Sequence, residues 1–232
     1  MTLRLDWTVP TTLTPAGLSE FAVTAENLGY HHLSVPEHLV SSAPAYESLT
    51  LVAFLAAVTT RIELATAMTI LPHRPVVLAA KQAAQLAHLS GGERAPASAD
   101  SLLRGRVWPC WLGVAVGSDP AESTALGVAP GARTALFEEQ IHALRLLWTR
   151  PQADFASAHL AFSGVTLTPR PRPIPLWLGG GTPRTGGRPR SLHRIATLAD
   201  GFTMSGLLAN RVNRGGALIA ELHTAVTEAG RD

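Results

Sequence analysis

The chain has 232 residues, of which 46% are hydrophobic and 16% charged, so it can bury a core and is not a disordered chain. Its formal net charge is only +2, and the arginines between Arg170 and Arg194 have one aromatic residue, Trp177, and no nucleic-acid motif among them. The sequence shows no apolar run of about 18 residues and no signal-peptide pattern, and its single cysteine excludes an internal disulfide. We therefore expect a cytoplasmic protein that binds neither nucleic acid nor membrane.

Strand-like and helix-like segments alternate along the chain, which is typical of an α/β protein with a parallel sheet. In chain order we expect a strand over 3–9, a helix over 18–28, a strand over 32–35, a helix over 48–58, a strand over 61–70, a helix over 76–89, a strand over 111–116, a helix over 132–148, a hairpin over 155–167, a strand over 175–178, a helix over 192–198, a strand over 201–204 and a helix over 207–229. The hairpin is expected to turn near Ser163 and Gly164. Such βα units form either an open doubly wound sheet or a (β/α)8 barrel.

Two observations bear on the choice between these architectures. No G-x-G-x-x-G motif follows the first expected strand, which disfavours a dinucleotide-binding open sheet and favours the barrel. The chain is, however, shorter than the ~250 residues usual for eight units. We expect one domain over residues 1–232, with a surface loop inserted at about 93–109, where small, polar and proline residues gather.

Four motifs carry a family resemblance: ENLGYHHLSVPEHL, TTRIELATAMTILPHRPVVLAAKQAAQLAHLSGG, PLWLGGGTPR and ATLADGF. In this order they resemble the bacterial-luciferase-like superfamily, and within it the oxidoreductases that use the deazaflavin coenzyme F420. The resemblance implies a TIM-barrel-type (β/α)8 fold, shortened by the last two βα units, with an excursion hairpin between the fourth and fifth strands. It also implies a homodimer and a cofactor held at the carboxyl ends of the strands.

The resemblance assigns the proton-transfer chemistry to the segment after the second expected strand. It makes His38 the acid/base near the hydride-bearing carbon, a task that suits an imidazole with an ordinary pKa of ~6.5. It places Glu37 against the cofactor ring and gives Ala67 and Met68 a non-prolyl cis peptide bond behind it. The alternatives are that His38 only fills a strand-to-loop bend and that Ala67 and Met68 are ordinary strand residues.

Two further segments match cofactor-lining positions of the family. Val116, Gly117 and Ser118 end the fourth expected strand, and Ser118 stands where some dehydrogenase members carry a glutamate, which speaks against a sugar-phosphate dehydrogenase. The other segment runs from Gly179 through Gly180 and Gly181 to Thr182 and matches a loop whose backbone amides approach the cofactor phosphate. A purely structural glycine turn is the alternative for the second segment.

The expected function is therefore hydride transfer between F420 and a small organic substrate, in which the cofactor carries the redox chemistry. The alternatives are an FMN-dependent monooxygenase and a non-catalytic flavin-binding protein with a degenerate barrel. No metal site is expected, because the histidines form no recognisable ligand set and no H-E-x-x-H motif occurs.

Overall fold

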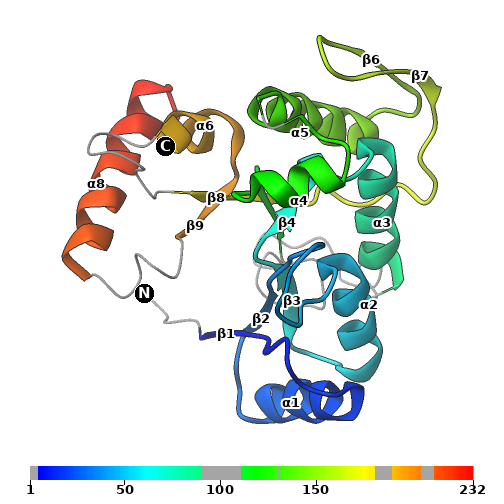
Figure 1. The fold of residues 1–232 in the computed structure, drawn as a ribbon, viewed down its shortest axis with the longest axis vertical. Helices are drawn as coiled ribbons and strands as arrows, with labels where there is room; N and C mark the ends of the chain where they lie inside the picture. The colour runs from blue at the N-terminus through cyan, green and yellow to red at the C-terminus, as the bar shows by residue number, and fades with distance from the viewer. Residues whose placement is uncertain (1–4, 90–110, 130, 181–189, 205–211, 232) are drawn as a thin grey trace.

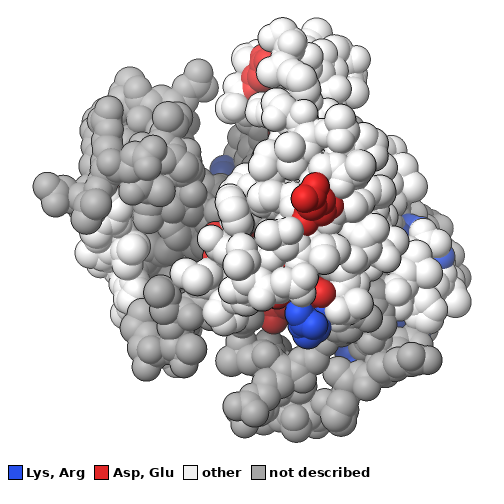
Figure 2. Space-filling model, turned by 90° about the horizontal axis from the view of Figure 1, so that it is seen from below, with Lys and Arg blue, Asp and Glu red and all other residues white. Residues whose placement is uncertain are grey.

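The computed structural model describes residues 5–89, 111–129, 131–180, 190–204 and 212–231. In these parts the strands lie toward the centre and most helices pack outside them (Figure 1). On the face of the molecule in Figure 2 the described surface is largely uncharged, and the basic patch near its lower centre lies next to acidic side chains.

The parallel strands form two sheets whose edges meet. Their bounds are β1 Asp6–Thr8, β2 His32–Val35, β3 Glu63–Thr66, β4 Thr69–Ile70, β5 Leu112–Ala115, β8 Leu176–Gly180 and β9 Gly201–Met204. One sheet has the order β1-β2-β3 and the other β4-β5-β8-β9, and a parallel bridge between Ala65 and Trp111 joins them. The strands thus follow one another in chain order, as the predicted barrel-type fold with six of eight βα units requires.

The connections between these strands are mostly helical. Their bounds are α1 Pro15–Asn27, α2 Ser48–Val58, the 3-10 helix η1 Leu71–His73, α3 Val76–Leu89, α4 Pro120–Ala125, α5 Arg133–Thr149, α6 Arg190–Leu198 and α8 Val212–Glu228. A hairpin of β6 Ala153–Ala156 and β7 Ala161–Val165 follows α5 and projects beyond it (Figure 1). It lies between the fourth and fifth strands of the barrel, counting β3 and β4 as one, as predicted.

Successive side chains of each strand point to opposite faces of the sheet. Those on one face belong to the hydrophobic core between sheet and helices, and those on the other face point into the barrel. Leu33 is fully buried and packs in the hydrophobic core with Leu64 and other apolar side chains. Near the amino ends of the strands, the His32 ring lies 4.9 Å from that of Trp111, which stacks at 4.3 Å on Trp177. Aromatic side chains thus pack together near the amino ends of the strands. The predicted site residues lie at the opposite, carboxyl ends.

Two elements differ from the sequence-based expectations, and a third expectation is not tested by the described residues. The strand expected over 61–70 is interrupted after Thr66 and resumes at Thr69. Helix α4 was not expected, although Asp119 caps its first turn by accepting from Ala121 N at 2.8 Å and Pro120 opens it. The insertion at about 93–109 lies outside the described residues.

The predicted position of the hairpin turn was wrong. The chain turns between Ala156 and Ala161, where Ser157 donates from its backbone N–H to Leu160 O at 2.9 Å. Ser163 Oγ and Gly164 N both donate to Asp154 Oδ1, at 2.6 and 2.7 Å. This carboxylate holds Ser163 and Gly164 within the second strand, so the serine-glycine pair does not mark the turn.

Glu26 near the end of α1 fixes the segment that leads into β3. Its carboxylate accepts from the backbone N–H groups of Thr60, Arg61 and Ile62 and from Thr60 Oγ1. Burial alone would raise the pKa of Glu26, but these donors outweigh it and lower the pKa to about 2 from its ordinary 4.5. The ionised carboxylate therefore stabilises the folded chain.

The Glu26→Gln variant is expected to lose a pH-dependent part of the free energy of unfolding. Because the folded-state pKa is lowered, the stabilisation by Glu26 is present in full above pH 4.5 and disappears as the pH falls toward 2. Urea unfolding at pH 6 should separate wild type from the variant by ~3 kcal/mol, and the gap should narrow at pH 3. Glu20→Gln, on the exposed side of the same helix, is the control. If the difference in the free energy of unfolding between wild type and Glu26→Gln stays constant between pH 6 and pH 3, the stabilisation does not come from the ionised carboxylate.

Candidate functional site

The predicted site residues lie at or just beyond the carboxyl ends of parallel strands, where barrel enzymes carry their chemistry. Five strands contribute: β2, β3, β4, β5 and β8. Glu37 is buried, His38 and Ser118 are exposed, and the remaining described site residues are half-buried: Ala67, Met68, Val116, Gly117, Gly179 and Gly180. Gly181 and Thr182 lie outside the described residues.

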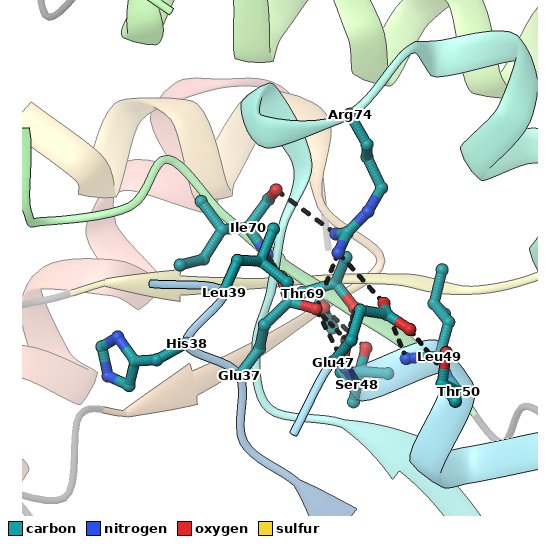
Figure 3. Close-up of polar contacts among 12 residues, drawn as sticks. Glu37, His38, Leu39, Glu47, Ser48, Leu49, Thr50, Thr69, Ile70 and Arg74 are labelled. Atoms are coloured by element: carbon teal, nitrogen blue, oxygen red, sulfur yellow. Dashed lines mark hydrogen bonds and ion pairs between the residues drawn. The ribbon is translucent and has the colours of Figure 1, made fainter. Parts of the chain in front are cut away.

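Glu37 is bonded through both carboxylate oxygens to neighbouring parts of the chain. Oε1 accepts from Ile70 N at 2.7 Å, and Oε2 accepts from Ser48 N at 3.0 Å, Ser48 Oγ at 2.6 Å and Arg74 Nη2 at 2.8 Å. The same Arg74 nitrogen donates to Glu47 at 3.0 Å, and Glu47 caps α2. Figure 3 shows these side chains converging. The cluster ties the segment after β2 to the start of α2 and to the end of β4.

The most buried part of this cluster is an ion pair of Glu37 and Arg74. The Glu37 side chain is 0% exposed and that of Arg74 is 8% exposed. Burial tends to raise the pKa of Glu37, but the Arg74 guanidinium and the Ser48 and Ile70 donors outweigh it, so the pKa lies below its ordinary value. Glu37 is therefore a charged anchor whose negative charge is compensated by Arg74.

His38 faces away from this anchor, although it is the next residue along the chain (Figure 3). Its side chain is 56% exposed, and Nδ1 lies 3.6 Å from Oε2 of Glu122 in α4. The buried anchor thus holds the backbone, while the imidazole remains accessible to a ligand. An accessible imidazole on a fixed backbone has the geometry of an acid/base group that acts on a bound ligand.

Met68 fits between the strands because the two residues packed against it, Gly113 and Gly179, have no side chains. The Ala67–Met68 peptide bond is cis, as the resemblance implies. A Cβ atom on Gly113 would lie 3.1 Å from Met68 Sδ and 1.9 Å from Thr66 O, and one on Gly179 would lie 3.0 Å from Met68 Cγ. Glycine at these two positions is what allows β3, β5 and β8 to approach one another beside Met68.

Gly117 makes the bend between β5 and α4. Its φ is +82°, and a Cβ there would lie 2.7 Å from Ile70 Cγ2, so only glycine fits without strain. Arg133 Nη1 donates to Gly117 O at 3.3 Å and to Ser123 Oγ at 3.2 Å. Ser123 also contacts His73 Nε2 at 3.0 Å, and burial lowers the pKa of His73. These contacts fix the loop that carries Val116, Gly117 and Ser118.

Two features of the β8–β9 side fit a phosphate-bearing flavin or deazaflavin. A Cβ on Gly180 would lie 2.9 Å from Ser191 Cβ, so glycine lets the first turn of α6 come close to the end of β8, and helix N-termini favour anions. Thr203 lies level with Gly179 in the sheet, and its buried Oγ1 has no hydrogen-bond partner within the described ranges. A polar ligand would satisfy such an atom. The residues present therefore fit this class of cofactor.

Sequence reasoning missed Arg74 and Glu122. Arg74 lies four residues beyond the end of the expected third strand, and nothing in the local pattern shows that its partner is Glu37, 37 residues earlier. The Asp119-Pro120 pair is a helix-start signal that would have placed Glu122 in a helix after β5.

Neither a metal site nor a membrane-spanning helix occurs in the described parts of the chain. No cluster of three or more His, Cys, Asp or Glu side chains suited to a metal ion occurs there. None of the helices described there combines the length and the apolarity needed to cross a bilayer.

Curated relatives include an uncharacterized protein of Mycobacterium tuberculosis. It is 33% identical over 149 residues, which are 63% of this chain and 45% of the relative. The chain thus aligns with less than half the length of this relative.

Solved structures share the fold at low sequence identity. An F420-dependent secondary alcohol dehydrogenase, determined with an F420-acetone adduct, superposes with a TM-score of 0.75 at 17% identity, over 100% of this chain and 66% of its own. The oxygenating constituent of 3,6-diketocamphane monooxygenase of Pseudomonas putida, in complex with FMN, superposes with a TM-score of 0.73 at 17% identity, over 100% of this chain and 64% of its own. Both similarities confirm the shortened TIM-barrel-type fold.

The sequence profile of the luciferase-like monooxygenase family matches residues 4–95 and 93–232. The two matched segments together take in nearly the whole sequence. The chain therefore belongs to the luciferase-like monooxygenase family.

Proposed function

We propose that the protein is an F420-dependent oxidoreductase that transfers a hydride between F420 and a small organic substrate. The observation that carries the proposal is His38, an exposed imidazole whose backbone is held by the buried Glu37–Arg74 anchor. F420, when bound, supplies the hydride chemistry. His38 gives or takes the proton that accompanies hydride transfer. We further propose that the protein works as a homodimer in the cytoplasm.

We assign the cofactor contacts to the rim at the carboxyl ends of the strands. Ala67 and Met68 lie behind the ring, and the segment 116–118 lines it. Gly179 and Gly180 begin the phosphate loop, with Gly181 and Thr182 after them. Glu37 has both oxygens occupied within the protein, and we assign it to holding the His38 backbone, in place of the ring contact that the resemblance implies.

A secondary alcohol is our first choice of substrate class. One of the structural neighbours that use F420 is a secondary alcohol dehydrogenase. His38 would take the hydroxyl proton as the carbon loses its hydride to oxidised F420, which gives a ketone and reduced F420. His38 would thus take the proton, and oxidised F420 would take the hydride with its two electrons.

An FMN-dependent monooxygenase is the second candidate, because a neighbour of equal sequence identity is an FMN monooxygenase. A parallel titration with F420 and with FMN, followed by absorbance and fluorescence, separates the two. Saturable micromolar binding of F420 alone is the expected result. Binding of FMN alone would favour the monooxygenase, and binding of neither would overturn the enzyme proposal.

A further inference from the structure

Glu122 is a buried carboxylate that reaches from α4 to the segment carrying His38. The residue is 1% exposed. Its Oε1 accepts from the backbone N–H groups of Leu39 and Val40, the latter at 3.0 Å. Both donors follow His38 directly, so this oxygen fixes the backbone on the carboxyl side of the histidine, as Glu37 does on its amino side.

The second oxygen of Glu122 has no hydrogen-bond partner in the described parts of the chain, although it is buried. A buried carboxylate oxygen without a donor costs free energy. His38 Nδ1 lies 3.6 Å from it, just beyond hydrogen-bond distance. A small rotation of the exposed imidazole closes this gap, and only an Nδ1-protonated ring satisfies the oxygen.

We propose that Glu122 is a positioning residue that holds His38 in its Nδ1–H tautomer and leaves Nε2 free to exchange the substrate proton. A base oriented by a third group is the arrangement that nucleophilic and acid/base sites use repeatedly. The inference rests on the proposed role of His38 as acid/base. Its structural part, the tautomer, stands independently of which cofactor binds.

The Glu122→Gln variant tests the tautomer directly. The glutamine carbonyl oxygen can still accept from Leu39 and Val40, whereas its NH₂ group would face His38 as a donor. His38 should then present a bare Nδ1 and carry its proton on Nε2. The readout is a long-range ¹H–¹⁵N NMR spectrum of cofactor-free protein with ¹⁵N-labelled histidine, recorded where the imidazole is neutral, with His38→Ala identifying the His38 signals.

Glu139→Gln is the matched control, because Glu139 Oε1 lies 2.8 Å from Nδ1 of His159 on the hairpin. It should change the His159 signals and leave those of His38 unchanged. We expect His38 to be Nδ1–H in wild type and Nε2–H in Glu122→Gln. An Nε2–H tautomer in wild type, or the same tautomer in both proteins, would overturn the proposal.

An Nε2–H tautomer in the wild-type spectrum would overturn the proposal even if Glu122→Gln does not fold. Glu122→Asp then serves as the second variant, because it keeps the charge but shortens the reach to His38 and should give a mixture of tautomers. Failure of the cofactor titration would remove the proposed function and leave the tautomer result intact. Failure of the tautomer test with normal F420 binding would remove only the positioning role.

Discussion

Replacing His38 with alanine is expected to lower turnover by about 10²–10⁴-fold, the usual contribution of a positioned acid/base. The dissociation constant for F420 should change only a few-fold, because the buried anchor that shapes the loop contains Glu37 and Arg74 and not the imidazole. Turnover is measured from the absorbance of F420 with small secondary alcohols such as propan-2-ol. The cofactor dissociation constant comes from the fluorescence titration of the same preparation.

His159→Ala provides the control for this variant. His159 is a partly exposed histidine of the hairpin whose Nδ1 lies 2.8 Å from a carboxylate. The His159→Ala variant should leave both the turnover and the dissociation constant for F420 unchanged. Equal loss of turnover and of cofactor affinity in His38→Ala would show that the histidine holds the cofactor and does not transfer a proton. A wild-type protein that binds F420 and turns over no substrate would favour the non-catalytic alternative.

Arg74→Ala is expected to lower the free energy of unfolding by ~3–5 kcal/mol, because it leaves a buried carboxylate without its counter-charge. Glu37 then keeps only the Ser48 and Ile70 donors, and Glu47 also loses a partner at 3.0 Å. Urea unfolding at neutral pH, followed by circular dichroism, gives the value. Removal of the Arg74 guanidinium should also make the segment after β2, which carries His38, more mobile.

Arg61→Ala is the matched control for the buried pair. Arg61 is also an arginine that pairs with a glutamate, at 3.9 Å from Glu26 Oε1, but its side chain is 67% exposed, so its removal should cost less than ~1 kcal/mol. The double variant Glu37→Gln with Arg74→Met should be more stable than Arg74→Ala, since it removes both charges. Equal losses for Arg74→Ala and Arg61→Ala would disprove the anchor role.

The sequence predicted the order of strands and helices because that order follows from local patterns. Apolar runs of strand length and helical spacing recur at the observed places, and the glycine after Leu28 marks the end of α1 within two residues. The break in the strand over 61–70 was missed, since its alternating pattern continues across Ala67 and Met68. The break coincides with the cis Ala67–Met68 peptide bond, which the alternation of apolar and polar residues does not record.

The candidate site was predictable only in part, and for the same reason. The family motifs located His38 and the rim segments along the chain. The partners of Glu37 lie 11, 33 and 37 positions away, so its character as a structural anchor emerges only from the folded arrangement. Arg74 and Glu122 carry no motif, and their roles come from what the fold places opposite them.

The hydrogen bonds of Glu122 also bear on the order in which the molecule folds. They join residues 83 and 82 positions apart in the chain, and contacts between such distant residues form slowly because a long loop must close first. We therefore expect the groups around His38 to be among the last to assemble. Substitutions of Glu122 are accordingly expected to raise the unfolding rate more than they lower the folding rate.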